Sequence, residues 1–250
     1  AGTTMTPAGE LLLGEARAVI ARTDHAVASI KQLSASDAGV LRLGAPLELP
    51  SGFLPDAMRK FAQTHPAVEI HVRHLSSSAQ LAAVGSGDLD VALLRARPID
   101  ETVDSVPVVE EELGVLVATS AVKDLTASGS IRLEQMKDLA WVPFPRSDSP
   151  VWFDEITAVL RSHGISRTTS DLGDQPLIAE VKLAAVQSGH AFAFAPPQWS
   201  QPVPDGISWY PLARRPLVRR TWATWLATSR RQDLAHLVAA LDQHSAPTLH

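Results

Sequence analysis

The sequence predicts an α/β protein of two lobes, preceded by a long helix. Short apolar segments alternate with amphipathic helical segments, and this alternation starts near residue 40 and again near residue 141. The 250 residues suffice for two small domains, each with a core of its own. Before residue 35 the apolar residues recur with helical spacing instead. These observations predict a helix followed by two α/β units.

The first 34 residues predict a helix that pairs with a second copy of the chain. Thr6 suits the N-cap, and Pro7 suits the first helical position, where its missing N–H is not needed. Apolar or small residues then recur at alternating spacings of four and three, which is typical of a coiled-coil seam. This narrow seam favours pairing over a helix lying on its own domain. The expected seam residues are Leu12, Ala16, Val19, Thr23, Ala26, Ile30 and Leu33.

The first α/β unit alternates strands with helices, which predicts a parallel sheet with right-handed crossovers. Its first and third strands are almost wholly apolar, and its second alternates apolar with polar residues, as a half-exposed strand does. Strands are expected at residues 40–45, 68–72, 89–94 and 113–118, and helices at residues 54–64 and 78–84.

The second unit repeats the alternation. In its second helix we expect Ile178, Val181 and Ala185 to face inward. A final strand and helix could belong to either unit. Strands are expected at residues 141–144, 168–173, 191–195 and 217–228, and helices at residues 151–163, 176–188 and 234–241.

Composition excludes several classes of protein. Hydrophobic residues make up 45% of the chain and charged residues 20%, as in ordinary globular domains, and the net charge of −5 argues against a nucleic-acid-binding surface. No apolar run reaches the roughly 18 residues of a membrane span, and the N-terminus lacks the pattern of a secretory signal. The chain has no cysteine, which excludes disulfides and fits a reducing compartment.

The sequence lacks the usual catalytic signatures. It has no phosphate-binding loop, no GxSxG elbow and no His-Glu-x-x-His. Residues 120–123 match SxxK by letters alone, and residues 110–112 (Glu-Glu-Glu) are typical of a solvated turn or edge. His71 and His74 lie on opposite faces of an expected strand. We therefore expect no catalytic residue, no metal site and no cofactor.

Loops at the carboxyl ends of the expected strands are the best candidates for binding a ligand, because ligands of open α/β sheets lie there, close to helix N-termini. Ser76, Ser77 and Ser78 follow a strand and start a helix; one serine suffices as an N-cap, so the others have hydroxyls to offer a ligand. These loops comprise residues 46–52, 75–78, 95–98 and 145–150.

Arginines follow two of these strands. Arg95 and Arg97 are either solvated or able to hold a carboxylate in a bidentate fork. Arg146 lies at the same kind of turn in the second unit. If it faces the three serines across a cleft, the pair of loops would suit a small anion.

Several segments resemble the LysR-type transcriptional regulators. Residues 4–9 (Thr-Met-Thr-Pro-Ala-Gly) are similar to the stretch where the family's DNA-binding domain meets its linker helix. Residues 87–92 (Gly-Asp-Leu-Asp-Val-Ala) resemble its Gly-x-Leu-Asp-x-Ala motif. Residues 186–196 are similar to its Val-x-x-Gly-x-Gly-Ile-x-x-Leu-Pro stretch, although His190 and Phe192 break that pattern. The order and spacing of these segments extend the resemblance over the whole chain.

The resemblance implies two Rossmann-like lobes of the type 2 periplasmic-binding-protein kind. It implies a linker and dimerisation helix at residues 1–34, an effector-binding lobe I at residues 39–118 and 217–245, and a lobe II at residues 119–216. Family members form dimers or tetramers and read promoter DNA with a winged helix-turn-helix ahead of the linker helix, a part that we expect this sequence to lack. With Ser78 included, the expected effector contacts are Leu47, Ser76, Ser77, Ser78, Arg97, Phe144, Arg146 and Gln175.

We therefore expect the effector-sensing and oligomerising region of a bacterial, cytoplasmic transcription regulator. It would bind a small metabolite, for which an anion is one option, between the lobes. The alternative is a solute-binding protein of a transporter, whose cleft looks alike in sequence; the absent secretory signal and the pairing helix argue against it. A transferase on the same scaffold would need convergent titratable groups, which the loops do not offer.

Overall fold

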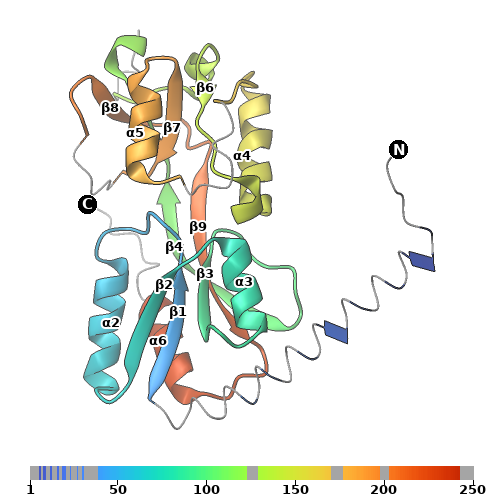
Figure 1. Ribbon diagram of the computed structural model, residues 1–250. Helices are drawn as coiled ribbons and strands as arrows, with labels where there is room; N and C mark the ends of the chain where they lie inside the picture. The colour runs from blue at the N-terminus through green and yellow to red at the C-terminus, as the bar shows by residue number, and fades with distance from the viewer. Residues whose placement is uncertain are drawn as a thin grey trace.

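The computed structural model describes residues 39–122, 129–169, 177–197 and 203–242, together with individual residues between Thr6 and Ile30. Within these ranges the chain forms two sheets that lie one above the other as two lobes (Figure 1). The long strand β4 (Val103–Glu112) runs from the first lobe toward the second, and β9 (Val218–Leu226) runs back beside it in the opposite direction. None of the helices in this described part is long and apolar enough to cross a bilayer.

The first sheet has five strands in the order β2-β1-β3-β9-β4. β1 (Val40–Ala45) pairs in parallel with β2 (Glu69–His74) and with β3 (Val91–Leu94), as the strand–helix alternation predicts. β9 runs antiparallel to both β3 and β4, so the sheet is mixed rather than wholly parallel. The apolar runs of β1 and β3 are buried because helices cover both faces of the sheet.

Three helices enclose this sheet. α2 (Phe53–Thr64) and α6 (Gln232–Asp242) pack together on one face, and α3 (Ser77–Gly85) covers the other. In α2 the buried residues Phe53, Ala57 and Phe61 recur every four positions, so a single apolar stripe faces the sheet.

The second sheet has four strands in the order β6-β7-β5-β8. β6 (Ala140–Trp141) is parallel to β7 (Ala191–Ala195), whereas β5 (Gly114–Ala118) is antiparallel to β7 and to β8 (Ile207–Pro211). α4 (Pro150–Ser162) and α5 (Ala179–Gln187) pack on opposite faces. The short 3-10 helices are η1 (Thr119–Ala121), η2 (Leu133–Met136) and η3 (Arg146–Asp148).

The structure corrects three expectations. β5 pairs in the second sheet, so the prediction that lobe I includes residues 113–118 is wrong: the chain leaves the first lobe after β4. β4 and β8 were not expected as strands. Of the strand expected at residues 168–173, Thr168 forms an isolated bridge with Trp141, and residues 170–173 lie outside the described part.

Within the described residues, the chain crosses between the lobes twice. It passes from β4 to β5 through Leu113 and returns from β8 to β9 through residues 212–217. The Leu113 N–H donates to the Leu217 carbonyl oxygen over 3.3 Å, so the two crossings are hydrogen-bonded side by side. The ladder between β4 and β9 reaches the crossings at Glu112 and Val218.

The leading segment is helical at its described residues from Ala8 to Ile30, and the Thr6 side chain accepts a hydrogen bond from the Gly9 N–H, which confirms the N-cap. Of the described seam residues, Leu12, Val19 and Ile30 are 65–70% exposed, and Ala16 and Thr23 are also exposed. Their side chains therefore face solvent rather than a core. Ala26 and Leu33 lie outside the described residues, and pairing through the seam stays a prediction.

Candidate functional site

A cavity of about 510 Å³ lies between the two lobes. The first lobe lines it with the loop after β1, the end of β2 and the start of α3. The second lobe lines it with the turn before α4 and with residues leading into α5. The cavity thus opens at the carboxyl ends of the parallel strands, where α/β proteins bind ligands.

The start of α3 shapes one wall of the cavity. Ser76 is the N-cap, and its hydroxyl accepts from the Ala79 N–H over 3.2 Å, while the Ser77 hydroxyl accepts from the Arg95 N–H over 3.1 Å. The buried Gln80 amide donates to the Leu75 carbonyl oxygen and accepts from the Leu93 N–H. Because these bonds join α3 to β3 and to the preceding turn, the serines are held rigidly at the cavity edge.

Three nearly buried cations meet at the cavity floor. Arg95, Lys182 and Arg219 line it with side chains no more than 7% exposed. Lys182 comes from α5 in the second lobe, whereas Arg95 follows β3 and Arg219 lies on β9 in the first. Buried cations require paired charges or hydrogen bonds, because desolvation of an unpaired charge is costly.

Two carboxylates pair with these cations. Glu48 accepts from the Lys182 ammonium over 2.5 Å and from the Arg219 guanidinium over 3.2 Å. Glu111 accepts from Arg219 over 3.0 Å and lies 3.9 Å from Arg95. Within this network three cations thus meet two carboxylates. His74 and Asp148 also line the cavity.

Burial and neighbouring charges oppose one another at these groups. Burial alone would raise the pKa of Glu48, but Lys182 and Arg219 offset this effect and lower the pKa below its usual 4.5. Burial lowers the pKa of Lys182, although Glu48 counteracts it. Burial and repulsion from Arg219 lower the pKa of Arg95 to about 9. Glu48 and Arg95 are therefore both charged at neutral pH.

Four of the residues expected at the site line this cavity: Leu47, Ser76, Ser77 and Phe144. Leu47 is 42% exposed at its mouth, and its carbonyl oxygen accepts from Arg95 over 2.6 Å. Ser78 is exposed and is not among the lining residues, and Gln175 lies outside the described part of the chain.

Arg146 is not among the residues that line the cavity, so it does not face the serines across it. It begins η3, is exposed, and donates two hydrogen bonds to the Asp154 carboxylate over 2.8 and 2.6 Å. These bonds raise the pKa of Arg146 and lower that of Asp154. The second lobe instead presents Asp148, Ser149 and Phe144 to the cavity.

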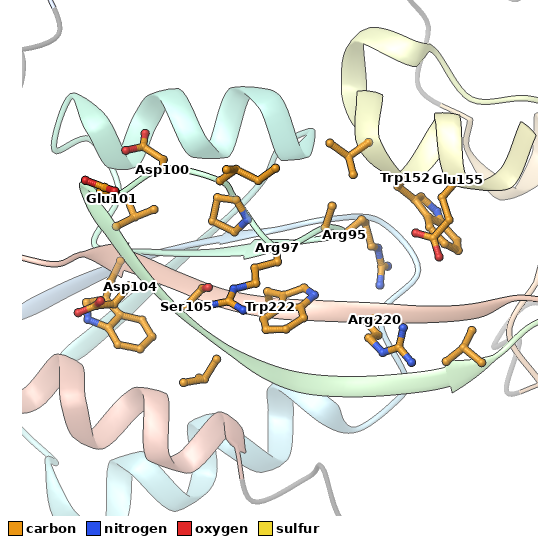
Figure 2. Close-up of a pocket in the computed structure, with 18 residues that line it drawn as sticks. Arg95, Arg97, Asp100, Glu101, Asp104, Ser105, Trp152, Glu155, Arg220 and Trp222 are labelled. Atoms are coloured by element: carbon orange, nitrogen blue, oxygen red, sulfur yellow. The ribbon is translucent and has the colours of Figure 1, made fainter. Parts of the chain in front are cut away.

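Arg97 lies in a second, wider groove of about 1200 Å³ on the other side of Arg95 and Trp152, which line both spaces. Figure 2 shows Arg97 beside Trp222, with its guanidinium carbon 5.7 Å from the ring centroid, a cation–π contact. The arginine is therefore directed away from the inter-lobe cavity. Four acidic residues line the same groove: Asp100, Glu101, Asp104 and Glu155.

Comparison with known proteins settles the family. Residues 34–246 match the family model of the LysR substrate binding domain. The chain belongs to this family. The HTH-type transcriptional regulator YnfL of Escherichia coli is 23% identical to it over 223 residues, which cover 88% of this chain and 73% of YnfL. The chain spans about half to three quarters of the length of the curated relatives it matches.

Solved structures show the same fold. CbnR, a LysR family transcriptional regulator, superposes with a TM-score of 0.65 at 18% identity, covering 97% of this chain and 82% of CbnR. The effector binding domain of BenM, solved with its effector benzoate, superposes with a TM-score of 0.65 at 18% identity, covering 84% and 96%. The two-lobed fold expected of a LysR substrate-binding domain is confirmed. The relatives are transcriptional regulators rather than enzymes, and the transporter alternative is not favoured.

Proposed function

We propose that this LysR substrate-binding domain senses a small anionic metabolite in the inter-lobe cavity and passes the signal to a DNA-binding part of a cytoplasmic regulator. The observation that carries the proposal is the convergence of three buried cations from both lobes on a cavity with apolar walls. A ligand that binds one arrangement of the lobes better than another shifts the population toward it.

The proposed contacts divide by chemistry. Ser76 and Ser77 of the first lobe offer hydroxyl groups, and Lys182 is the cation that the second lobe contributes. Leu47, Phe144, Trp152 and Ile178 supply apolar surface for the body of the ligand. BenM, whose effector binding domain was solved with benzoate, gives a precedent in this fold for a carboxylate with an apolar body.

A thermal-shift screen of small carboxylates and aromatic acids tests the site. A ligand at a hundred times its Kd should raise the Tm by about 5–10 °C for a domain of this size. Leu47→Trp should abolish the shift, because an indole at the cavity mouth takes the ligand's volume. Val203→Trp, at a 37% exposed position outside the cavity, is the matched control. Equal shifts in both variants would place the ligand elsewhere.

We further propose that the leading helix joins two copies of the chain, which can assemble further into tetramers. The support is the exposure of Leu12, Val19 and Ile30 on one helical stripe. Ile30→Glu should convert a dimer to a monomer in light scattering, because it places a carboxylate in the apolar seam of each helix. Ile99→Glu, at a fully exposed isoleucine of the first lobe, should leave the mass unchanged. A chain that is monomeric before any substitution would contradict the pairing.

A further inference from the structure

Glu48 has an unusual backbone conformation at the cavity floor. Its φ of 59° lies in the left-handed region, which residues other than glycine rarely adopt. Two guanidinium groups hold its carbonyl oxygen there: Arg95 donates to it over 3.0 Å and Arg219 over 2.7 Å. Strained backbone that its surroundings hold in this way is concentrated at functional sites.

The strained loop places the Glu48 side chain between the lobes. One carboxylate oxygen accepts from Lys182 of the second lobe and the other from Arg219 of the first. The Glu48 side chain is 22% exposed and lines the cavity, whereas the Glu111 side chain is 9% exposed and is not among the lining residues. Of these two carboxylates, Glu48 is the one that a ligand can reach.

We propose that Glu48 is a built-in competitor of the effector: its carboxylate occupies the place on Lys182 and Arg219 that a ligand carboxylate takes. The ligand class is a small monocarboxylic acid with an apolar body, which would lie against Leu47 and Phe144. This inference rests on the proposed function, because it assumes that the effector binds in this cavity.

The exchange of one carboxylate for another is favourable on electrostatic grounds. Lys182 is almost fully buried, so a ligand that separated it from Glu48 without replacing the charge would leave an unpaired ammonium group. An incoming carboxylate avoids that loss. The displaced Glu48 side chain reaches solvent through the cavity, because it is already partly exposed there.

Competition by Glu48 lowers the apparent affinity for the ligand. Binding requires the fraction of molecules in which the Glu48 carboxylate has left Lys182, and the apparent Kd rises as that fraction falls. The bond between Glu48 and Lys182 also joins the two lobes, so the exchange replaces a link within the chain by one made through the ligand.

Calorimetric titration of the full chain with benzoate and with its neutral counterpart benzamide tests the inference. Glu48→Gln should bind benzoate about tenfold more tightly than the wild type, since the charge-assisted hydrogen bonds of the Glu48 carboxylate to Lys182 and Arg219 no longer have to be broken. Its affinity for benzamide should change less than about twofold. Failure of Glu48→Gln to gain affinity for benzoate, including failure to bind it, overturns the proposal, as does an equal gain for benzamide.

Two further variants separate the place of the carboxylate from its charge. Glu48→Asp keeps the charge but draws it back by one methylene, so it should also bind benzoate more tightly than the wild type. Glu111→Gln removes the same charge from the same network without vacating the cavity, so its gain should be smaller than that of Glu48→Gln. Wild-type affinity in Glu48→Asp, or an equal gain in Glu111→Gln, would show that only total charge matters. Circular dichroism confirms that each variant is folded.

The failure of this inference is distinguishable from the failure of the proposed function. If an acid from the thermal-shift screen binds the wild type and Leu47→Trp abolishes that binding, the cavity is the effector site whatever the Glu48 variants do. If no compound of the screen binds in the cavity of the wild type or of Glu48→Gln, both proposals are wrong.

Discussion

Replacing Asp90 with asparagine should destabilise the first lobe by about 3 kcal/mol. Asp90 is fully buried just before β3, within the Gly-Asp-Leu-Asp-Val-Ala segment. Its carboxylate accepts three hydrogen bonds from Arg42 of β1, over 2.7–3.0 Å, and one from Arg231 over 3.3 Å. Asparagine has nearly the same shape but no charge, so the substitution removes the electrostatic part of these contacts.

The size of the expected stability loss depends on which partners each arginine keeps after the substitution. Breaking a buried ion pair costs about 3–5 kcal/mol when the partner charge is stranded. Arg231, whose side chain is 3% exposed, keeps two hydrogen bonds to Asp233 over 3.1 and 2.7 Å. Arg42 is 25% exposed and can be partly hydrated. The loss should therefore lie near the lower end of the range, which corresponds to a fall in Tm of about 6–12 °C.

Urea denaturation followed by circular dichroism measures the change. Asp88→Asn is the matched control, because Asp88 lies two residues away, is exposed, and accepts from the Ser86 hydroxyl over 2.8 Å. It should change the free energy of unfolding by less than about 1 kcal/mol. A loss below about 1 kcal/mol in Asp90→Asn, or equal losses in the two variants, would refute the reasoning about Asp90.

Three other predictions concern packing, hydrogen bonding and pH. Gly114→Ala should cost about 2–3 kcal/mol in urea denaturation, because its Cβ would lie 2.4 Å from the indole of Trp209, whereas Gly85→Ala, with open space around it, should be close to neutral. Gln80→Leu should cost about 2–4 kcal/mol by the same assay, because two buried backbone groups lose their partners. The lowered pKa of Glu48 stabilises the folded state above the usual value of 4.5, so the Tm should fall as the pH drops below that value, and it should fall less in Glu48→Gln. Equal pH profiles of the wild type and Glu48→Gln would contradict the third expectation. A loss of stability in Gly114→Ala or Gln80→Leu no larger than that in Gly85→Ala would contradict the first two.

The sequence predicted the strands that show an apolar run, and it predicted the half-exposed β2 from the alternation of apolar and polar residues. β3, β5 and β7 are buried along their lengths, β1 is buried at four of its six residues, and all four strands contain few polar residues. β4 was missed because Pro107 interrupts it and charged residues end it. Proline is tolerated there because β4 is an edge strand, and the register with β9 shifts next to Pro107.

The site was predicted only in part, because its charges are brought together by tertiary structure. The strand-end loops located Leu47, Ser76 and Ser77, since those loops follow directly from the order of strands and helices. Lys182 could not be found in this way: its partner Glu48 is 134 residues distant in sequence. In α5, Lys182 and Val186 are buried, whereas the predicted Val181 and Ala185 are half-buried and Ile178, at the N-cap, is 42% exposed. The inward face is therefore shifted by one position from the predicted one.

The sequence did contain one sign of this site, a lysine within the apolar stripe of a helix. A helix whose apolar stripe includes one lysine is normally read as amphipathic, with the lysine directed to water. In α5 the buried stripe is shifted by one position, so that Lys182 donates to the Glu48 carboxylate and to the Phe194 carbonyl oxygen. The Glu48 carboxylate of the facing lobe and the Phe194 carbonyl oxygen together make that orientation favourable.

The position of β9 in the first sheet sets the order in which the protein can fold during synthesis. β9 lies between β3 and β4, so those strands have no partner on that side until residues 113–217 have left the ribosome. At about 5–20 residues per second this takes about 5–20 s. The four strands of the second sheet all lie within residues 114–211, so that lobe is complete first. During the interval the nascent chain exposes one edge of β3 and leaves β4 without a partner, and unpaired strand edges of this kind favour aggregation.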